Sequence, residues 1–143
     1  MTQGHLDNDC IFCKIIRCEM PSFKIYEDED ALAFMDVNPL TPGHALVVPR
    51  YHAQDILEMP GDWIGKSFVA AGRVARAIQK TLSPDGISIV QANGPGAKQS
   101  VFHLHVHVIP RSINDNLAMN WELVAGDMEK IRRMAKKISA NVE

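Results

Sequence analysis

The sequence predicts an α+β fold in which helices pack against an antiparallel sheet. About five short apolar runs have the length and composition of strands, whereas only two or three segments have a helical pattern. The first two runs, 23–27 and 31–35, are separated by the polar residues 28–30, which is typical of a hairpin. Strands and helices do not alternate regularly, so a parallel sheet built from repeated strand–helix–strand units is not expected.

The other strands follow from apolar runs that end at turn residues. They are expected at 44–49, 87–92 and 102–109. Dense turn signals precede the first of them, and Pro110 is expected to close the last. These boundaries leave a glycine-containing polar loop at 93–100, directly before the last strand.

The most regular helical pattern covers 62–82, and Asp62 is a suitable N-cap. Its apolar residues recur three or four positions apart and are expected to form one stripe: Ile64, Phe68, Ala71, Ala75, Ile78 and Leu82. A short helix is expected at 10–18. A second amphipathic helix is expected at 124–141, and its basic face is interpreted as a solvated surface.

Size, composition and charge limit the classes of function. The chain has 143 residues, of which 46% are hydrophobic and 22% charged, so we expect one globular domain. A formal net charge of -2 provides no basic field for a nucleic-acid backbone. No apolar run approaches the roughly 20 residues that span a bilayer, and residues 1–9 lack a signal-peptide pattern. We therefore expect a cytoplasmic protein with neither a nucleic-acid nor a membrane partner.

Three histidines alternate with aliphatic residues in the last expected strand. Successive side chains of a strand point to opposite faces, so His103, His105 and His107 share one face, and Leu104 and Val106 point into the core. Three imidazoles spaced about 7 Å apart would repel one another if all were protonated. The pattern therefore indicates neutral rings that are hydrogen-bonded or bound to a metal.

The segment around these histidines resembles the signature of the histidine triad (HIT) family of nucleotide hydrolases and transferases. It reads QSVFHLHVHVI and spans 99–109. Three further segments resemble the family in the same order: CIFCKII at 10–16, DVNP at 36–39 and PGHALVVP at 42–49. The resemblance covers most of the chain except about 30 C-terminal residues. It implies the HIT fold, a five-stranded antiparallel sheet with packed helices, and a homodimer that buries the long helix between protomers.

The resemblance implies a single HIT domain over residues 1–143. We expect its core at about 10–111 and its C-terminal helix at about 124–141. One sequence does not decide whether the long apolar stripe of the helix at 62–82 packs inward or across a dimer.

The resemblance implies that His105 attacks the α-phosphorus of a nucleotide and forms a covalent nucleotidyl-histidine intermediate. A neutral imidazole held in one tautomer is a competent nucleophile toward phosphorus. His107 matches the family position that contacts the phosphate and assists the leaving group, and His44 matches the histidine that lies against the triad. Ser100 completes the expected catalytic set, because its hydroxyl can stabilise charge on the phosphate or reach the leaving group.

A nucleotide-binding set is also implied. Asp36 matches the residue that binds the ribose hydroxyls, and a carboxylate can accept two hydrogen bonds from a vicinal diol. A turn-capping role is the alternative for Asp36, and ordinary core packing is the alternative for Phe12 and Phe34, the candidates for the base pocket. The set is completed by residues of the matching segments and of the loop at 93–100: Val37, Asn93, Gln99, Ser100 and Val101.

Cys10 and Cys13 form a CxxC pair that is ambiguous by itself. A redox pair normally follows a strand in a strand–helix–strand unit, and no strand is expected before this one. Some HIT proteins combine such a pair with two histidines to bind zinc, which implies a structural site made by Cys10, Cys13, His52 and His103. Reduced thiols without a metal are the alternative.

Three functions stay open at this point. The first is hydrolysis of nucleoside 5′-phosphoramidates or acyl-adenylates, with purine nucleotides as substrates and AMP as a product. The second is hydrolysis of dinucleoside polyphosphates such as diadenosine tetraphosphate, because Pro110 and Arg111 look more like that branch. The third is a regulatory module that binds nucleotide or zinc with little turnover. The full set of His44, His105, His107 and Ser100 argues against the third, since a binder needs no nucleophile.

Overall fold

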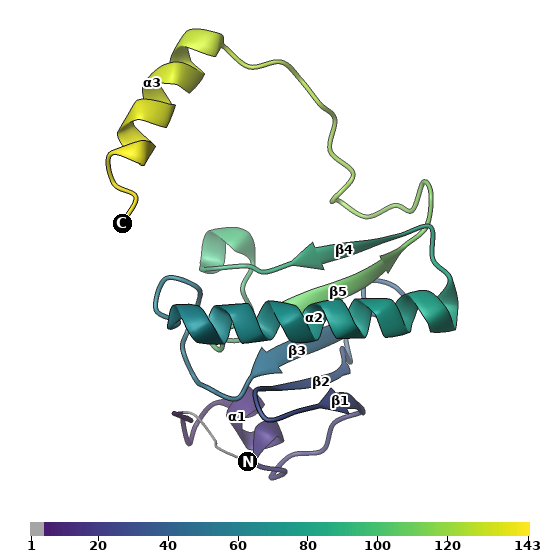
Figure 1. Cartoon of the computed structure of the whole chain (residues 1–143). Coiled ribbons are helices and arrows are strands. Elements are labelled where there is room, and N and C mark those ends of the chain that lie inside the picture. The colour runs from purple at the N-terminus through teal and green to yellow at the C-terminus, as the bar shows by residue number, and fades with distance from the viewer. Residues whose placement is uncertain (1–4) are drawn as a thin grey trace.

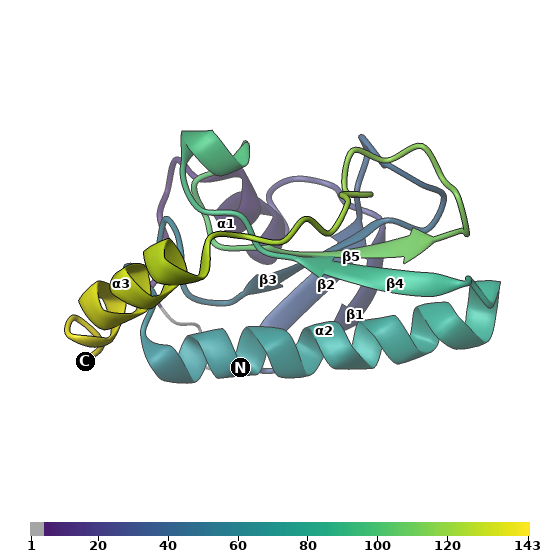
Figure 2. The same cartoon turned by 90° about the horizontal axis from the view of Figure 1, so that it is seen from above.

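A five-stranded antiparallel sheet forms the centre of the molecule (Figure 1). The structure is a computed structural model that describes residues 5–143, so residues 1–4 of the expected domain lie outside it. The strand order is β1-β2-β3-β5-β4, and every neighbouring pair is antiparallel. The long helix covers one face and a short helix lies on the other (Figure 2). The predicted α+β fold class is confirmed.

Four of the five strands lie within one or two residues of their predicted positions. The strands are β1 (Lys24–Glu27), β2 (Ala31–Met35), β3 (Ala45–Pro49), β4 (Gly86–Val90) and β5 (Val106–Arg111). The prediction was wrong for β5, which begins at Val106 instead of residue 102 and continues through Pro110. Proline is tolerated there because the pairing of β5 with β3 ends at Val108, and the Pro110 carbonyl bonds the Thr41 hydroxyl at 2.9 Å.

The helices differ from the predictions at their ends. They are α1 (Ile11–Ile16), α2 (Gly61–Leu82) and α3 (Met128–Ser139), and a 3-10 turn, η1, spans Pro95–Ala97. Asp62 is not the N-cap of α2: Pro60 has that position, and Asp62 lies in the first turn, where its charge complements the helix dipole. The C-terminal helix begins at Met128 instead of residue 124, because the Asp127 carboxylate caps the Glu129 and Lys130 amides at 3.0 and 3.2 Å.

The main hydrophobic core lies between α2 and the sheet. The helix buries its face around Ala71, Val74 and Ile78, which packs on strand residues that include Val47 and Val106. The apolar stripe predicted for α2 is therefore confirmed at its centre, but two of its predicted residues are not buried. Phe68 and Leu82 are 41% and 48% exposed, because they lie on the flank of the helix and not under it.

A second hydrophobic cluster occupies the opposite face of the sheet, under α1. Phe12 and Ile16 of α1 pack there on alternate residues of β2 and β3. The intervening residues of the same strands belong to the α2 core. Burial on both faces explains why β2 and β3 read as continuous apolar runs.

The C-terminal helix stands apart from the sheet. Residues 112–127 form an extended arm that carries α3 away from the body of the molecule (Figures 1 and 2). No α3 residue is buried. Among the described residues, no helix is long and apolar enough to cross a membrane.

The tight turn before β3 depends on Gly43. Its φ of +94° is unfavourable for residues with a side chain, and a Cβ there would lie 2.5 Å from Leu82 Cδ1 and 3.1 Å from Pro110 Cγ. We expect Gly43→Ala to lower the free energy of unfolding by about 1–3 kcal/mol. Urea denaturation followed by circular dichroism measures this change.

Gly65→Ala in α2 is the matched control for Gly43→Ala, because a Cβ at Gly65 meets no atom within 4 Å. Its expected effect is a stabilisation of about 0.5–1 kcal/mol, from the better helix propensity of alanine. Equal effects of the two substitutions would contradict the role given to Gly43.

Candidate functional site

Two groups of histidines meet on the face of the sheet that α1 covers. The rings of His105 and His107 lie 5.0 Å apart, and Phe12 of α1 packs edge-on against His103 and His105. Residues 103–105 precede β5, yet the predicted alternation holds, because Leu104 and Val106 both belong to the α2 core on the other face. The three histidines are thus held by the packing of their neighbours.

Backbone contacts fix the tautomer of His105. Its Nδ1 lies 2.7 Å from the carbonyl oxygen of His103, and a carbonyl can only accept, so Nδ1 carries the proton. The other ring nitrogen, Nε2, therefore has a free lone pair. Since the ring is 4% exposed and packed against Phe12, this nitrogen is held in one orientation. These are the properties of a nucleophilic imidazole.

A second chain of hydrogen bonds fixes His44 and His107. The Leu40 amide donates to Nδ1 of His44 at 3.0 Å, so the proton of neutral His44 is on Nε2. That nitrogen lies 2.9 Å from Nδ1 of His107, which must accept. The remaining proton of His107 is then on its Nε2, where it can donate to an anion. His107 and His105 therefore offer complementary groups, one hydrogen-bond donor and one lone pair.

All three rings of this site are kept neutral. Burial lowers the pKa of His44 and of His105. The pKa of His107 falls to about 4, because burial disfavours the charged ring and His105 and His44 lie close by. The neutral forms are the ones that the hydrogen-bond pattern above requires.

Asp36 lies beside these histidines at the end of β2. Its Oδ2 is 3.4 Å from Nε2 of His44, and its Oδ1 accepts the Asn38 amide at 2.8 Å. The structure therefore brings Asp36 to the predicted site and also gives it the turn-capping contact of the alternative interpretation. Val37, the next residue, is exposed.

The two candidates for a base pocket lie in the same hydrophobic cluster. Phe12 and Phe34 are buried and pack edge-on, with ring centroids 5.6 Å apart. Both belong to the cluster under α1, as the core-packing alternative expects, and Val101 packs on the same cluster. Phe12 also contacts the His105 ring, so it links that cluster to the candidate nucleophile.

The loop at 93–100 is held by side-chain amides. Gln99 Oε1 accepts the Gly94 amide at 2.8 Å, and its Nε2 donates to the carbonyls of Gln54 and Val101 at 2.6 and 3.1 Å. Asn93 Oδ1 accepts the Ile56 amide at 2.8 Å. Both amides thus shape the loop in this structure, and the direct nucleotide contacts expected of them stay predictions. Ser100 is exposed at the end of the loop.

The second group consists of Cys10, Cys13, His52 and His103, whose ligand atoms all lie within 4.8 Å of one another. Nε2 of His103 donates to the Pro49 carbonyl at 3.1 Å, so its Nδ1 has a free lone pair. That atom lies 3.4 Å from each cysteine sulfur and 3.2 Å from Nδ1 of His52.

These distances are those of a tetrahedral metal site. Metal–ligand bonds of about 2.3 Å to sulfur and about 2.0 Å to nitrogen give sulfur–nitrogen edges of about 3.5 Å and nitrogen–nitrogen edges of about 3.3 Å. The contact between Cys10 and Cys13 also lowers the pKa of the Cys10 thiol, which favours the thiolate that binds metal, and raises that of Cys13. Two sulfur and two nitrogen donors in this geometry fit a closed structural site.

Sequence reasoning missed the groups that fix the ring tautomers. The carbonyls of Pro49 and His103 and the amide of Leu40 are backbone groups, so residue identity does not mark them. The Pro-Gly sequence before His44 was the available signal for the Leu40 contact, because a tight turn there brings the amide onto the ring.

Comparison with known proteins agrees with this geometry. The profile of the HIT domain matches residues 17–114. An adenosine 5′-monophosphoramidase of Saccharomyces cerevisiae is 37% identical over 139 residues, which cover 96% of this chain and 85% of the yeast protein. An adenylylsulfatase of Arabidopsis thaliana is 40% identical over 133 residues, which cover 93% of this chain and 64% of the plant protein.

Solved structures have the same fold. A Streptococcus mutans protein superimposes with a TM-score of 0.91 at 38% identity, covering 100% of this chain and 91% of that chain. A zinc-bound histidine triad family protein from Mycobacterium smegmatis gives a TM-score of 0.73 at 35% identity, covering 93% of this chain and 98% of that chain. Since the family profile spans more than half of the sequence, the chain belongs to the HIT family.

Proposed function

We propose that the protein is a nucleotide hydrolase that releases AMP from adenosine 5′-phosphoramidates and acyl-adenylates by attack at the α-phosphorus. The observation that carries this proposal is the free Nε2 lone pair of His105, fixed by the 2.7 Å bond from Nδ1 to the His103 carbonyl. Similarity to proteins named adenosine 5′-monophosphoramidase and adenylylsulfatase supports adenylyl substrates.

In the first step, Nε2 of His105 forms a bond to the α-phosphorus. The bond from phosphorus to the leaving atom breaks, and its electron pair stays on that atom. A leaving phosphoramidate nitrogen also takes up a proton, whereas the oxygen of an acyl-adenylate leaves as a carboxylate. In the second step, water attacks the phosphorus and the bond to His105 breaks, which returns the lone pair to Nε2. Over the cycle, water supplies the oxygen gained by AMP. Its protons balance the proton taken up by the leaving amine, or go to solvent when a carboxylate leaves.

His107 and His44 stabilise the charge that develops on phosphorus. The Nε2 proton of His107 is the donor available to a phosphate oxygen or to the leaving group, and His44 fixes that tautomer through its 2.9 Å bond to Nδ1. Asp36 is proposed to bind the ribose hydroxyls with the carboxylate oxygen that faces His44, because its other oxygen already accepts the Asn38 amide.

We also propose that the Cys10, Cys13, His52 and His103 cluster holds a structural zinc ion. Bound zinc would crosslink α1, the residues after β3 and the segment before β5. The tetrahedral spacing of the four donor atoms supports this, as does the zinc-bound structural relative. His103 would then be a ligand whose own carbonyl positions His105.

Arg111, part of the sequence feature that favoured dinucleoside polyphosphates, already has partners within this chain. The Arg111 guanidinium is already bonded to the Asp115 carboxylate at 2.6 and 2.7 Å and to the Ser88 hydroxyl at 2.9 Å. This ion pair ties the end of β5 to the start of the arm. Arg111 thus has a structural partner set, which leaves the mononucleotide substrates as the better supported class.

The nucleophile is tested with His105→Gly and adenosine 5′-phosphoramidate. We expect AMP release, measured by chromatography, to fall at least about 10³-fold, because no other group with a free lone pair replaces Nε2. His5→Gly is the matched control, since it removes an exposed histidine outside the site, and should keep full activity. Wild-type activity in a folded His105→Gly variant would refute the mechanism.

The pH dependence follows from the lowered pKa values. A histidine with a lowered pKa stays neutral at a pH where a free imidazole, with a pKa near 6.5, is protonated. We expect kcat/KM for the phosphoramidate to stay level from pH 8 through pH 6.5 and to fall as the pH approaches about 4, where His107 gains a proton. The nonenzymatic rate is subtracted at each pH. A midpoint near 6.5 would contradict this assignment.

Zinc content tests the metal site. Elemental analysis of protein purified without chelators should find about one zinc per chain, and Cys13→Ser should lose it together with thermal stability. Cys18→Ser is the matched control, because Cys18 is exposed and outside the cluster, and it should keep the metal. Zinc-free wild-type protein, or equal zinc in both variants, would exclude the site.

A further inference from the structure

The cluster of two cysteines and two histidines opens to the surface on one side. A polar hollow of about 480 Å³ lies over it, and two of the four expected ligands, Cys10 and His52, line this hollow. The other two, Cys13 and His103, are fully buried. One sulfur of the cysteine pair is therefore open to small solutes, and the other is shielded.

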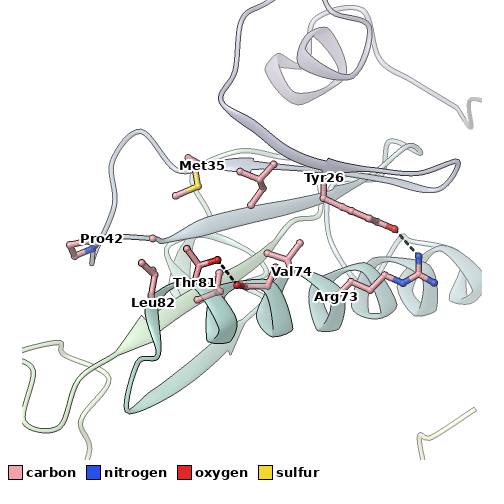
Figure 3. Close-up of a pocket in the computed structure, with 11 residues that line it drawn as sticks. Tyr26, Met35, Pro42, Arg73, Val74, Thr81 and Leu82 are labelled. Carbon is pink, nitrogen blue, oxygen red and sulfur yellow. Dashed lines mark hydrogen bonds between the residues drawn. The ribbon is translucent and has the colours of Figure 1, made fainter.

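An apolar pocket on the opposite face of the sheet offers no such groups. It has a volume of about 450 Å³ and is bounded by β1, the Pro42–Gly43 turn and the C-terminal half of α2 (Figure 3). Tyr26, Val74 and Leu82 line it, and neither a cysteine nor a histidine does. Of these two hollows, only the one over the cluster exposes a side chain that can be oxidised and can bind a metal.

The two cysteines are placed to react with each other. Cys10 is the N-cap of α1, and the Cys13 amide in the first turn donates to its sulfur at 3.5 Å. Both sulfurs lie 3.4 Å from Nδ1 of His103, and they are within 4.8 Å of each other. Cysteines separated by two residues at the start of a helix are the arrangement of disulfide-forming CxxC pairs. A sulfur–sulfur bond here would close within one turn of α1.

We propose that Cys10 is a site of oxidative modification, at which hydrogen peroxide joins it to Cys13, releases the bound zinc and lowers the hydrolytic activity. This inference rests on the zinc site and on the hydrolase activity proposed above. The modification is reversible, because a thiol reductant restores both sulfur ligands.

The oxidation takes place in two steps. The Cys10 thiolate attacks one oxygen of the peroxide, the oxygen–oxygen bond breaks, hydroxide leaves, and Cys10 becomes a sulfenic acid. The Cys13 thiolate then attacks the Cys10 sulfur, and the sulfur–oxygen bond breaks to release a second hydroxide. The two cysteines have lost two electrons, which the peroxide has gained, and protons from solvent convert both hydroxides to water.

The rim of the hollow favours an uncharged oxidant. Asp7, Asp9 and Glu58 line the hollow beside Cys10. Their negative potential repels anionic oxidants, whereas hydrogen peroxide is small and neutral. The same potential attracts a divalent cation, so the hollow is also a suitable route for zinc to leave and to return.

Loss of the sulfur ligands would affect the candidate nucleophile through two short connections. The carbonyl of His103, one of the expected ligands, accepts the Nδ1 proton of His105 at 2.7 Å. Phe12 lies between the two cysteines in α1, and its ring centroid is 5.1 Å from that of His105. Oxidation therefore removes the crosslink that holds α1 and the His103 segment together around His105. A nucleophile that is less well positioned reacts more slowly.

Zinc release under peroxide tests the proposal. Reduced, zinc-loaded full-length protein is treated with hydrogen peroxide beside a chromogenic zinc chelator, the peroxide is removed with catalase, and free thiols are blocked. Trypsin then cleaves after Lys14 and Arg17, which separates the Cys10 and Cys13 pair from Cys18, and the peptides are weighed by mass spectrometry.

We expect the release of about one zinc per chain, together with a peptide that contains Cys10 and Cys13 and is lighter by two hydrogens. AMP release should fall about tenfold or more in parallel, because the restraint on His105 is lost. A thiol reductant with added zinc should restore both the metal and the activity.

Two variants serve as controls. Cys18→Ser changes an exposed cysteine outside the cluster and should release zinc as the wild type does. Cys10→Asp keeps a good N-cap for α1 and a side chain that can bind zinc, but it cannot form the disulfide. It should hold its zinc at peroxide concentrations that empty the wild-type site.

Three results would overturn the proposal: zinc that stays bound in wild type while Cys18 is oxidised, zinc loss without a bond between Cys10 and Cys13, and zinc loss with undiminished AMP release. Equal zinc loss from Cys10→Asp would also overturn it, and if that variant takes up no zinc, the wild-type results decide. The proposed function fails separately, because zinc content and AMP release are measured before peroxide is added.

Discussion

The hydrogen bond from Nε2 of His103 to the Pro49 carbonyl is the contact on which both sites depend. It is 3.1 Å long and fully buried, and it decides which nitrogen of the ring faces the two cysteines. The same residue presents its own carbonyl to Nδ1 of His105 at 2.7 Å. The end of β3 therefore fixes the orientation and tautomer of the His103 ring, and the backbone of His103 fixes those of the His105 ring. A change at Pro49 or in the cysteine cluster would therefore alter the orientation of the His105 ring, although neither group contacts a substrate there.

The second constraint is the burial of uncharged polar groups. Leaving a buried imidazole without a partner costs about 1–3 kcal/mol, so each ring in this site needs a hydrogen bond. The chain supplies these partners largely from its backbone, through Leu40, Pro49 and His103. Backbone donors and acceptors are fixed by the fold and do not titrate. Burial then keeps the rings neutral, so that each ring stays in the one tautomer that its backbone partner selects. The nucleophile and the hydrogen-bond donor both need a neutral ring in a fixed tautomer.

The sequence predicted features that depend on local periodicity. The alternation of Leu104 and Val106 with the histidines survives although β5 begins only at Val106, because both aliphatic residues are drawn into the α2 core. The fold class was expected from the strand and helix patterns, whereas the grouping of Cys10 with His52 was implied by the family resemblance. The passage of β5 through Pro110 was not predictable, because it depends on where the pairing with β3 stops.

Long-range packing accounts for the other errors. Phe68 fits the helical stripe by spacing, but it lies outside the core between α2 and the sheet and is 41% exposed. Likewise, the apolar face of α3 looks like an ordinary core face in the sequence. Only the structure shows that the arm carries it away from the chain's own core.

The two faces of the sheet are coupled through adjacent residues. Met35 and Gly43 line the apolar pocket, and the next residue in each case, Asp36 or His44, belongs to the histidine site on the opposite face. Side chains of neighbouring residues in extended chain point to opposite faces, so packing on one face restrains the other. The turn at Gly43 therefore also positions His44, whose ring in turn sets the tautomer of His107.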